Sequence, residues 1–245
     1  MPQLKNKSKT DESKRPEIYV RPGAQHTYVS HGEVVPIETG KNNTNARTHR
    51  QIKSDFKGTL QPYLTSSDMQ NTVQAIILLR DAAHGTYNTQ GRETLAPQKV
   101  EEMLKAVAKM TGQRQNRKND APLNQKEIQA YHEAVLEIAQ DMQSDMVMNE
   151  ELGNNFEANW NLGRLFHNLG KPLDALPYIS AAQKIQPDNP KVAARLTEVA
   201  FDLNNESPST TNEIRVLSAL THTVSLEASY PVAVLQRRAQ KTFDL

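Results

Sequence analysis

The chain has 245 residues and a formal net charge of +1, and 37% of its residues are hydrophobic, so there is room for one or two domains but part of the chain should add little to a core. It has no cysteine, which excludes disulfides, thiolate metal sites and cysteine nucleophiles. No apolar run approaches the roughly 20 residues that cross a bilayer, and the polar N-terminus has no signal-peptide core, so we expect a cytoplasmic protein without a membrane span.

The N-terminal residues are basic and poor in apolar side chains. Residues 1–57 carry 11 Lys or Arg against 6 Asp or Glu, a composition typical of solvated chain. We therefore assign residues 1–66 to a basic arm and linker, partly disordered or extended. Turns at Pro22-Gly23 and His31-Gly32 predict short strands within it. The strand-forming residues are Tyr19, Val20, Tyr28, Val29, Val34 and Val35.

Residues 41–65 are polar and basic, and we interpret them as a solvated linker. Their cationic side chains could bind phosphate groups. However, the stretch has no regular stacking aromatics, no zinc-ligand spacing and no helix-turn-helix pattern. Nucleic-acid binding through the arm is therefore an alternative function, and not the expected one. The residues concerned are Arg47, His49, Arg50, Lys53 and Lys57.

A helical hairpin is predicted for residues 67–122. Ser67-Asp68 can cap a helix that ends near Gly85, and its apolar residues cover most of its faces, as expected of a central helix. Pro97 opens a second helix and Gly112 closes it. The inward residues of that helix, at helical spacing, are Val100, Met103, Leu104 and Val107.

A longer helix opens the third region, residues 123–245. Asn124 and Glu127 have the form of a capping box, and the helix should extend to about Val147. Its apolar residues recur three and four positions apart, which predicts a narrow stripe that packs on one partner helix. They are Ile128, Tyr131, Val135, Ile138 and Met142.

The strongest pattern in the chain is the stretch at 156–189, FEANWNLGRLFHNLGKPLDALPYISAAQKIQPDN, which predicts two antiparallel helices joined by a turn. Gly163 and Ala182 are small where the helices must approach closely. Gly170 can take the left-handed geometry that ends a helix, and Pro187 cannot continue the second one. The residues that define this unit are Leu162, Gly163, Phe166, Ala175, Ile179, Ala182 and Pro187.

These residues resemble a tetratricopeptide repeat, in which Leu-Gly, an aromatic residue, Ala, an aromatic or aliphatic residue, Ala and a closing Pro recur at fixed offsets. The resemblance implies an all-α solenoid whose concave groove binds a peptide or a segment of a partner, without chemistry of its own. Two features depart from the pattern. Asn159 stands at the usual Trp position, with Trp160 one place later. Pro177 falls inside the second helix unless Asp174 caps that helix.

The remaining C-terminal residues predict a second, degenerate repeat and a cap. PKVAARLTEVAFDLNN provides a first helix, with Leu196 and Ala200 on its inner side. A loop at 204–211 then separates it from a helix at about 212–226. Pro231 opens a last, capping helix, whose basic residues suit the C-terminal end of a helix dipole. These are Arg237, Arg238 and Lys241.

The resemblance also implies a ligand groove along the first helices of the two repeats. Relatives that hold the acidic tail of chaperones use Asn and basic residues there, and Asn161, Lys191 and Arg195 stand at the matching places. The preceding repeat of such a clamp is missing, however. We expect Trp160 either to anchor a ligand or to pack beneath the helix at 124–147. The candidate groove residues are Trp160, Asn161, Arg164, His167, Lys191, Arg195 and Glu198.

No catalytic site is expected. His132-Glu133 lacks the second His of a helical zinc pair, and none of the 10 Gly belongs to a phosphate-binding loop. We therefore expect a non-enzymatic protein without metal or cofactor, an adaptor, scaffold or chaperone-like protein that binds another protein. The alternative is a structural component of a larger assembly, such as a virion or secretion machine, which docks through its arm. Homo-oligomerisation is left open.

Overall fold

The computed structural model describes residues 27–30, 33–36, 47–85, 94–112 and 122–226, together with Leu235 and residues 237–240. The chain divides into two units, Met1–Arg47 and Thr48–Leu245. In the first unit, β1 (Thr27–Ser30) pairs antiparallel with β2 (Glu33–Pro36). These strands lie where the β-branched pattern predicted them. The strand expected at Tyr19 and Val20, and the disorder expected of the arm, concern residues outside the described ranges.

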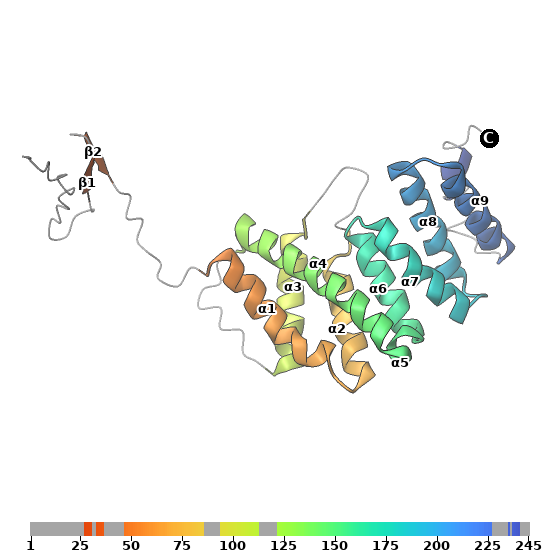
Figure 1. Ribbon diagram of the computed structural model, residues 1–245, viewed down its shortest axis with the longest axis horizontal. Helices are drawn as coiled ribbons and strands as arrows, with labels where there is room; N and C mark the ends of the chain where they lie inside the picture. Colours follow the sequence, from red (N-terminus) through yellow and green to blue (C-terminus); the bar gives the residue numbers. More distant parts are fainter. Residues whose placement is uncertain are drawn as a thin grey trace, which may run out of the picture. The chain divides into compact units, whose positions relative to one another are not determined.

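The second unit is all-α in the residues that the structure describes, and its helices follow one another along the chain as Figure 1 shows. Side-chain caps begin most of them, with Thr48 and Asn124 forming reciprocal capping boxes. The helices are α1 (His49–Leu64), α2 (Met69–Ala82), α3 (Pro97–Thr111), α4 (Gln125–Met148), α5 (Glu150–Gly153), α6 (Phe156–Asn168), α7 (Pro172–Ile185), α8 (Pro190–Glu206) and α9 (Thr210–Ser225).

Helix α1 corrects the prediction of a linker at 41–65 and moves the start of the helical unit from residue 67 to Thr48. Its sequence is polar, but four apolar residues recur every fourth position and are buried on one face. They are Ile52, Phe56, Leu60 and Leu64. The basic residues Lys53 and Lys57, expected to be solvated, pair with acidic side chains of α4, at Nζ–O distances of 2.5 to 3.4 Å.

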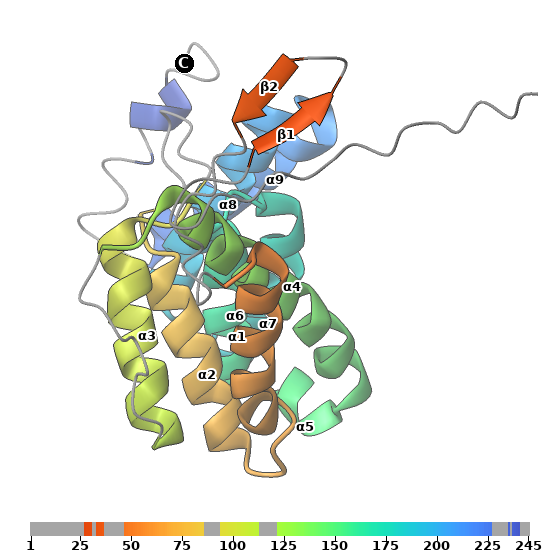
Figure 2. The same cartoon turned by 90° about the vertical axis from the view of Figure 1, so that its left-hand side faces the viewer.

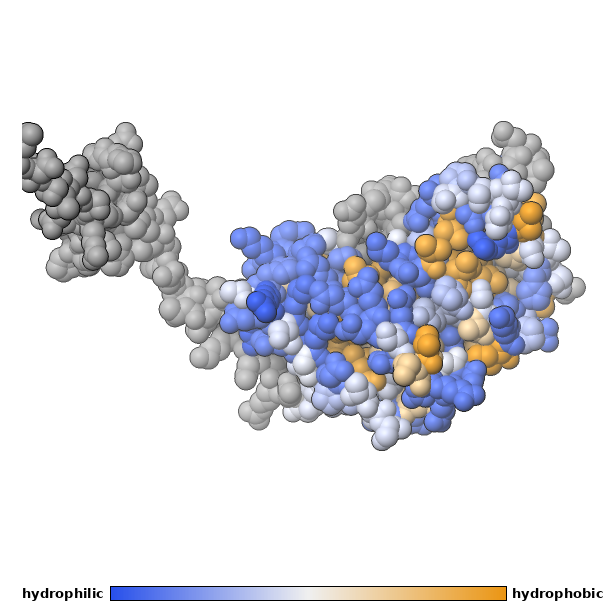
Figure 3. Space-filling view, viewed as in Figure 1, coloured by the Kyte–Doolittle hydropathy of each residue, from blue (hydrophilic) through white to orange (hydrophobic). Residues whose placement is uncertain are grey.

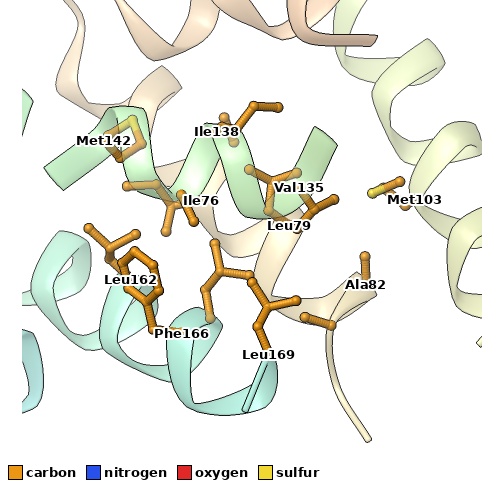
Figure 4. Packing of buried hydrophobic residues seen from close by; sticks show 14 of the residues in the cluster. Ile76, Leu79, Ala82, Met103, Val135, Ile138, Met142, Leu162, Phe166 and Leu169 are labelled. Atoms are coloured by element: carbon orange, nitrogen blue, oxygen red, sulfur yellow. The ribbon is translucent and has the colours of Figure 1, made fainter. Parts of the chain in front are cut away.

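The predicted hairpin of α2 and α3 is present, and α2 is the central helix, since it packs against α1, α3 and α6. Helices α1, α2 and α3 lie side by side in Figure 2. Apolar side chains of α2, α4 and α6 meet between the helices in Figure 4, and this contact joins the N-terminal helices to the C-terminal ones in one core. Labelled there are Ile76, Leu79, Ala82, Met103, Val135, Ile138, Met142, Leu162, Phe166 and Leu169.

Helices α6 to α9 form a short α-solenoid, in which each helix packs against the next. The turn between α6 and α7 uses Gly170 at φ 69°, with the Lys171 N–H donating to the Phe166 carbonyl at 2.9 Å. The apolar residues that define the unit at 156–189 are buried as predicted, whereas Pro187 is exposed in the connection to α8. Buried are Leu162, Gly163, Phe166, Ala175, Ile179 and Ala182.

Lys171, and not Asp174, precedes α7, so Pro177 lies inside the helix, the alternative that the sequence had left open. Pro177 is exposed there, and because it has no N–H, the Leu173 carbonyl receives no helical hydrogen bond from it. Two other helix boundaries differ from the predictions. Helix α8 extends to Glu206, and Ser209 caps α9, so the connection is shorter than the predicted loop at 204–211. The short helix α5 was not predicted at all.

The cap predicted after Pro231 is described only in part. Leu235 and Ala239 are buried against a second, small core, which includes Phe201 of α8 and Val216 of α9. Arg237 is exposed, and Arg238 contacts α8. Lys241 lies outside the described residues. The end of α8 is therefore covered by C-terminal residues, as a solenoid requires.

Candidate ligand-binding surface

Trp160 was expected either to anchor a ligand from an exposed position or to pack inside the protein. It is half-buried and packs against the main core, so it is not a fully exposed anchor. Its ring stacks on Phe156 at a centroid distance of 6.5 Å and an angle of 12°. Phe156 is also half-buried, and the two rings together present partly open aromatic surface.

Arg164 lies one turn further along α6, with its guanidinium carbon 5.2 Å from the centroid of the Trp160 ring. The side chain is half-buried, and its Nε atom is buried without a hydrogen-bond partner among the described residues. Burial, together with the charges of Arg80 and Arg195, lowers the pKa of Arg164 to about 10. Arg164 is therefore still cationic at neutral pH, in surroundings that disfavour its charge.

Arg80 from α2 and Arg195 from α8 lie near enough to Arg164 for their charges to lower its pKa, and we call these three residues the arginine cluster. Each of these two neighbours has an acid of its own. Arg80 Nη2 lies 2.5 Å from Asp81 Oδ1, and Arg195 Nη1 lies 3.0 Å from Glu198 Oε2. Among the described residues, no acid makes such a pair with Arg164. One positive charge of the cluster is thus left without a counter-ion.

Asn161 was predicted to face the ligand, and this is wrong because α2 packs over that side of α6. The side chain is fully buried. Its oxygen accepts a hydrogen bond from Arg80 Nη1, and its Nδ2 donates to the carbonyl oxygen of Glu157 at 2.7 Å and to the carboxylate at 3.0 Å. Asn161 therefore orients Arg80 and is not open to a ligand.

His167 was also predicted to line the groove, but only 6% of it is exposed. Its Nε2 lies 2.7 Å from Asp202 Oδ2, and its Nδ1 lies 3.1 Å from Arg195 Nη1. Asp202 also accepts a hydrogen bond from Arg238 of the C-terminal residues. Although burial opposes its ionisation, the hydrogen bonds from His167 and Arg238 hold the pKa of Asp202 below its ordinary value. His167 thus joins α6 to α8 inside the protein.

Six of the seven predicted groove residues lie together, and of these Asn161 and His167 are buried. The four that are partly exposed are Trp160, Arg164, Arg195 and Glu198. Lys191 is exposed in the first turn of α8, and no contact in the described residues joins its side chain to the arginine cluster. Arg80 was missed, since it stands 81 residues before its partner Asn161. The available signal was an arginine within a helix that is apolar on most faces, because such a residue needs a partner.

A different hollow, of about 580 Å³, lies between α2 and α3. Ile77, Leu78 and Met103 contribute apolar surface to it, and Lys99 and Glu102 are among its polar residues. Its charges are balanced, and nothing in it matches the unpaired charge of Arg164. This hollow is a second location at which a ligand could bind.

Within the described ranges, no three His, Asp or Glu residues are grouped so that they could hold a metal ion. None of the helices described is both long and apolar enough to cross a membrane. No protein-family model, curated protein or solved structure matched the chain.

Proposed function

We propose that the helical unit is a non-enzymatic protein-binding module of the tetratricopeptide-repeat type, which holds a segment of another protein against α2, α6 and α8. The observation that carries this proposal is Arg164, a half-buried cation whose guanidinium carbon lies over Trp160 and whose charge is opposed by those of Arg80 and Arg195. Among the described residues, no acid forms an ion pair with it. Burying a charge without a counter-ion costs free energy, and an anionic group of a partner at the exposed part of the guanidinium would offset this cost.

The neighbouring aromatic pair supports the same surface. Trp, Tyr and Arg are enriched among the residues that contribute most to protein–protein binding, and a planar guanidinium stacked on an aromatic ring loses little freedom when it binds. Phe156, Trp160 and Arg164 provide this combination along one side of α6. We place such an adaptor or chaperone-like protein in the cytoplasm.

The test is a selection of peptides from a displayed library on the immobilised full chain, repeated with Trp160→Ala and Arg164→Gln. We expect the parent chain to enrich peptides that both variants retain poorly. Arg50→Gln is the matched control, because Arg50 is exposed on α1 and its loss changes the net charge equally. Selected peptides that bind Arg164→Gln as tightly as the parent would overturn the proposal.

A second function, as a structural component of a larger assembly, is favoured by a separate observation at the C-terminal end. Hydrophobic residues gather over the C-terminal helices in Figure 3, while hydrophilic ones dominate over α1 and α4. Ile214 and Leu217 of α9 are 62% and 44% exposed. An assembly subunit should associate through such residues. A chain that sediments as a monomer at every concentration, and does so equally after Ile214→Asp, would argue against this role.

A further inference from the structure

The charge balance of the arginine cluster restricts the kind of ligand that the surface can take. Asp81 and Glu198 already neutralise Arg80 and Arg195, so the excess is the single charge of Arg164. A polyanion such as a nucleic-acid backbone is bound by many cationic groups at once, whereas the cluster with its two carboxylates offers one net positive charge. One isolated anionic group fits the local charge.

The position of Arg164 on Trp160 restricts the ligand further. The guanidinium carbon of Arg164 lies over the Trp160 ring, so an anion must approach from a side that the ring leaves free, and in the guanidinium plane it can accept two N–H bonds at once. A planar carboxylate has the matching geometry. Trp160 and Phe156 are partly exposed and precede Arg164 along α6, so they offer an apolar contact that a free inorganic anion could not use.

We infer that the bound segment carries an acidic side chain next to an apolar one, the carboxylate accepting hydrogen bonds from Arg164 and the apolar side chain packing on Trp160 and Phe156. This inference rests on the proposed function and specifies its ligand. It differs from a clamp built on Asn161 and Lys191, since Asn161 is buried and Lys191 lies apart from the cluster. Arg80, which stands outside the repeat-like helices, takes part by adding positive charge near Arg164, and its own side chain is held by Asn161 and Asp81.

Trp160 reports on this contact directly, because it is the only tryptophan of the chain and lies against Arg164. The full chain is titrated at low salt with a short peptide of alternating glutamate and leucine, and with its counterpart in which glutamine replaces glutamate. We expect the glutamate peptide to change the fluorescence and to bind about tenfold or more tightly than the glutamine peptide. Added salt should reduce this difference.

Variants of the full chain identify the group responsible. Arg164→Gln should abolish the preference for glutamate, and Arg164→Lys, which keeps the charge but loses the planar fork, should reduce it. Arg50→Gln should leave it unchanged. Circular dichroism verifies that each variant is folded. If Arg164→Gln proves unfolded, Arg164→Lys still decides the matter, because a side chain that acts only as a distant charge would lose nothing on that change.

The outcomes separate this inference from the proposed function. If the two peptides bind equally and depend on Trp160, the acidic ligand is wrong while a peptide-binding surface stands. If neither peptide binds and the displayed library yields none that needs Arg164, both are wrong. Inorganic phosphate alone is the third ligand. Since it lacks the apolar part, it should bind much more weakly, and phosphate binding as tight as that of the glutamate peptide would overturn the inference.

Discussion

Gly163 offers the sharpest test of how α6 and α7 pack. A Cβ atom at this position would stand 2.5 Å from Ile179 Cδ1, 2.7 Å from Cγ1 and 3.0 Å from the backbone nitrogen. The side-chain atoms can rotate away at some cost, but the backbone nitrogen moves only if α7 moves. Overpacking of this kind costs about 1–3 kcal/mol, whereas replacing Gly by Ala within a helix favours folding by roughly 0.5–1 kcal/mol. Gly163→Ala should therefore reduce the free energy of unfolding, by up to about 2.5 kcal/mol.

Gly58 is the matched control, because it lies inside α1 and a Cβ there would meet nothing within 4 Å. Gly58→Ala should raise stability by about 0.5–1 kcal/mol, so the two substitutions should differ in sign. Urea denaturation of both variants measures the difference. In an Ile179→Ala background, Gly163→Ala should cost less, and the cost that is left reports the contact with the backbone nitrogen. If Gly163→Ala stabilises the protein as Gly58→Ala does, the close approach of α6 and α7 is wrong.

Two further predictions concern charged contacts. Asp202→Asn should lower the free energy of unfolding by about 2–3 kcal/mol, because it weakens two charge-assisted hydrogen bonds. Since these bonds depress the pKa of Asp202, the stability that they add is present above the unfolded pKa of about 3.9 and is lost as the pH falls through the lower folded pKa. Denaturation between neutral and acidic pH should therefore show a steeper loss of stability for the parent than for the variant. Parallel profiles would contradict this. Glu137→Gln should cost less than about 1 kcal/mol, since its ion pairs with Lys53 and Lys57 are partly exposed, and the cost should shrink at high salt. A cost that does not depend on salt would mean that Glu137 acts through packing.

The sequence predicts most helices because each has an apolar pattern and end signals that are local. The capping box of Asn124 with Glu127 and the turn at Gly170 are both confirmed at the predicted residues. Helix α1 was missed for a physical reason. Only four apolar residues of α1 are buried, and they stand among many polar and charged ones. The average composition of the segment is therefore polar, although these four residues form a narrow apolar stripe on one face of the helix. Its basic residues were expected to be solvated, because the sequence does not show that acidic residues of α4 lie opposite them.

The sequence predicts only part of the proposed ligand-binding surface. The register of a helix gives the direction of each side chain, but it does not show which other helix packs over that side chain. Arg164 and Arg195 follow from the repeat register. The burial of Asn161 depends on α2, and that of His167 on Asp202 in α8, and neither contact leaves a local pattern in the sequence. Arg80 belongs to the same class, since its role comes from packing between helices that are distant in the chain.

A partner segment that lies on α2, α6 and α8 beside Arg164 should protect these helices from hydrogen–deuterium exchange. We would measure exchange in the full chain, with and without a peptide selected by it. We expect slower exchange in α6 and α8 and at the end of α2, with no change in α3 or α9. Protection in α3, beside the hollow between α2 and α3, or along the exposed residues of α9, with α6 and α8 unaffected, would contradict this expectation.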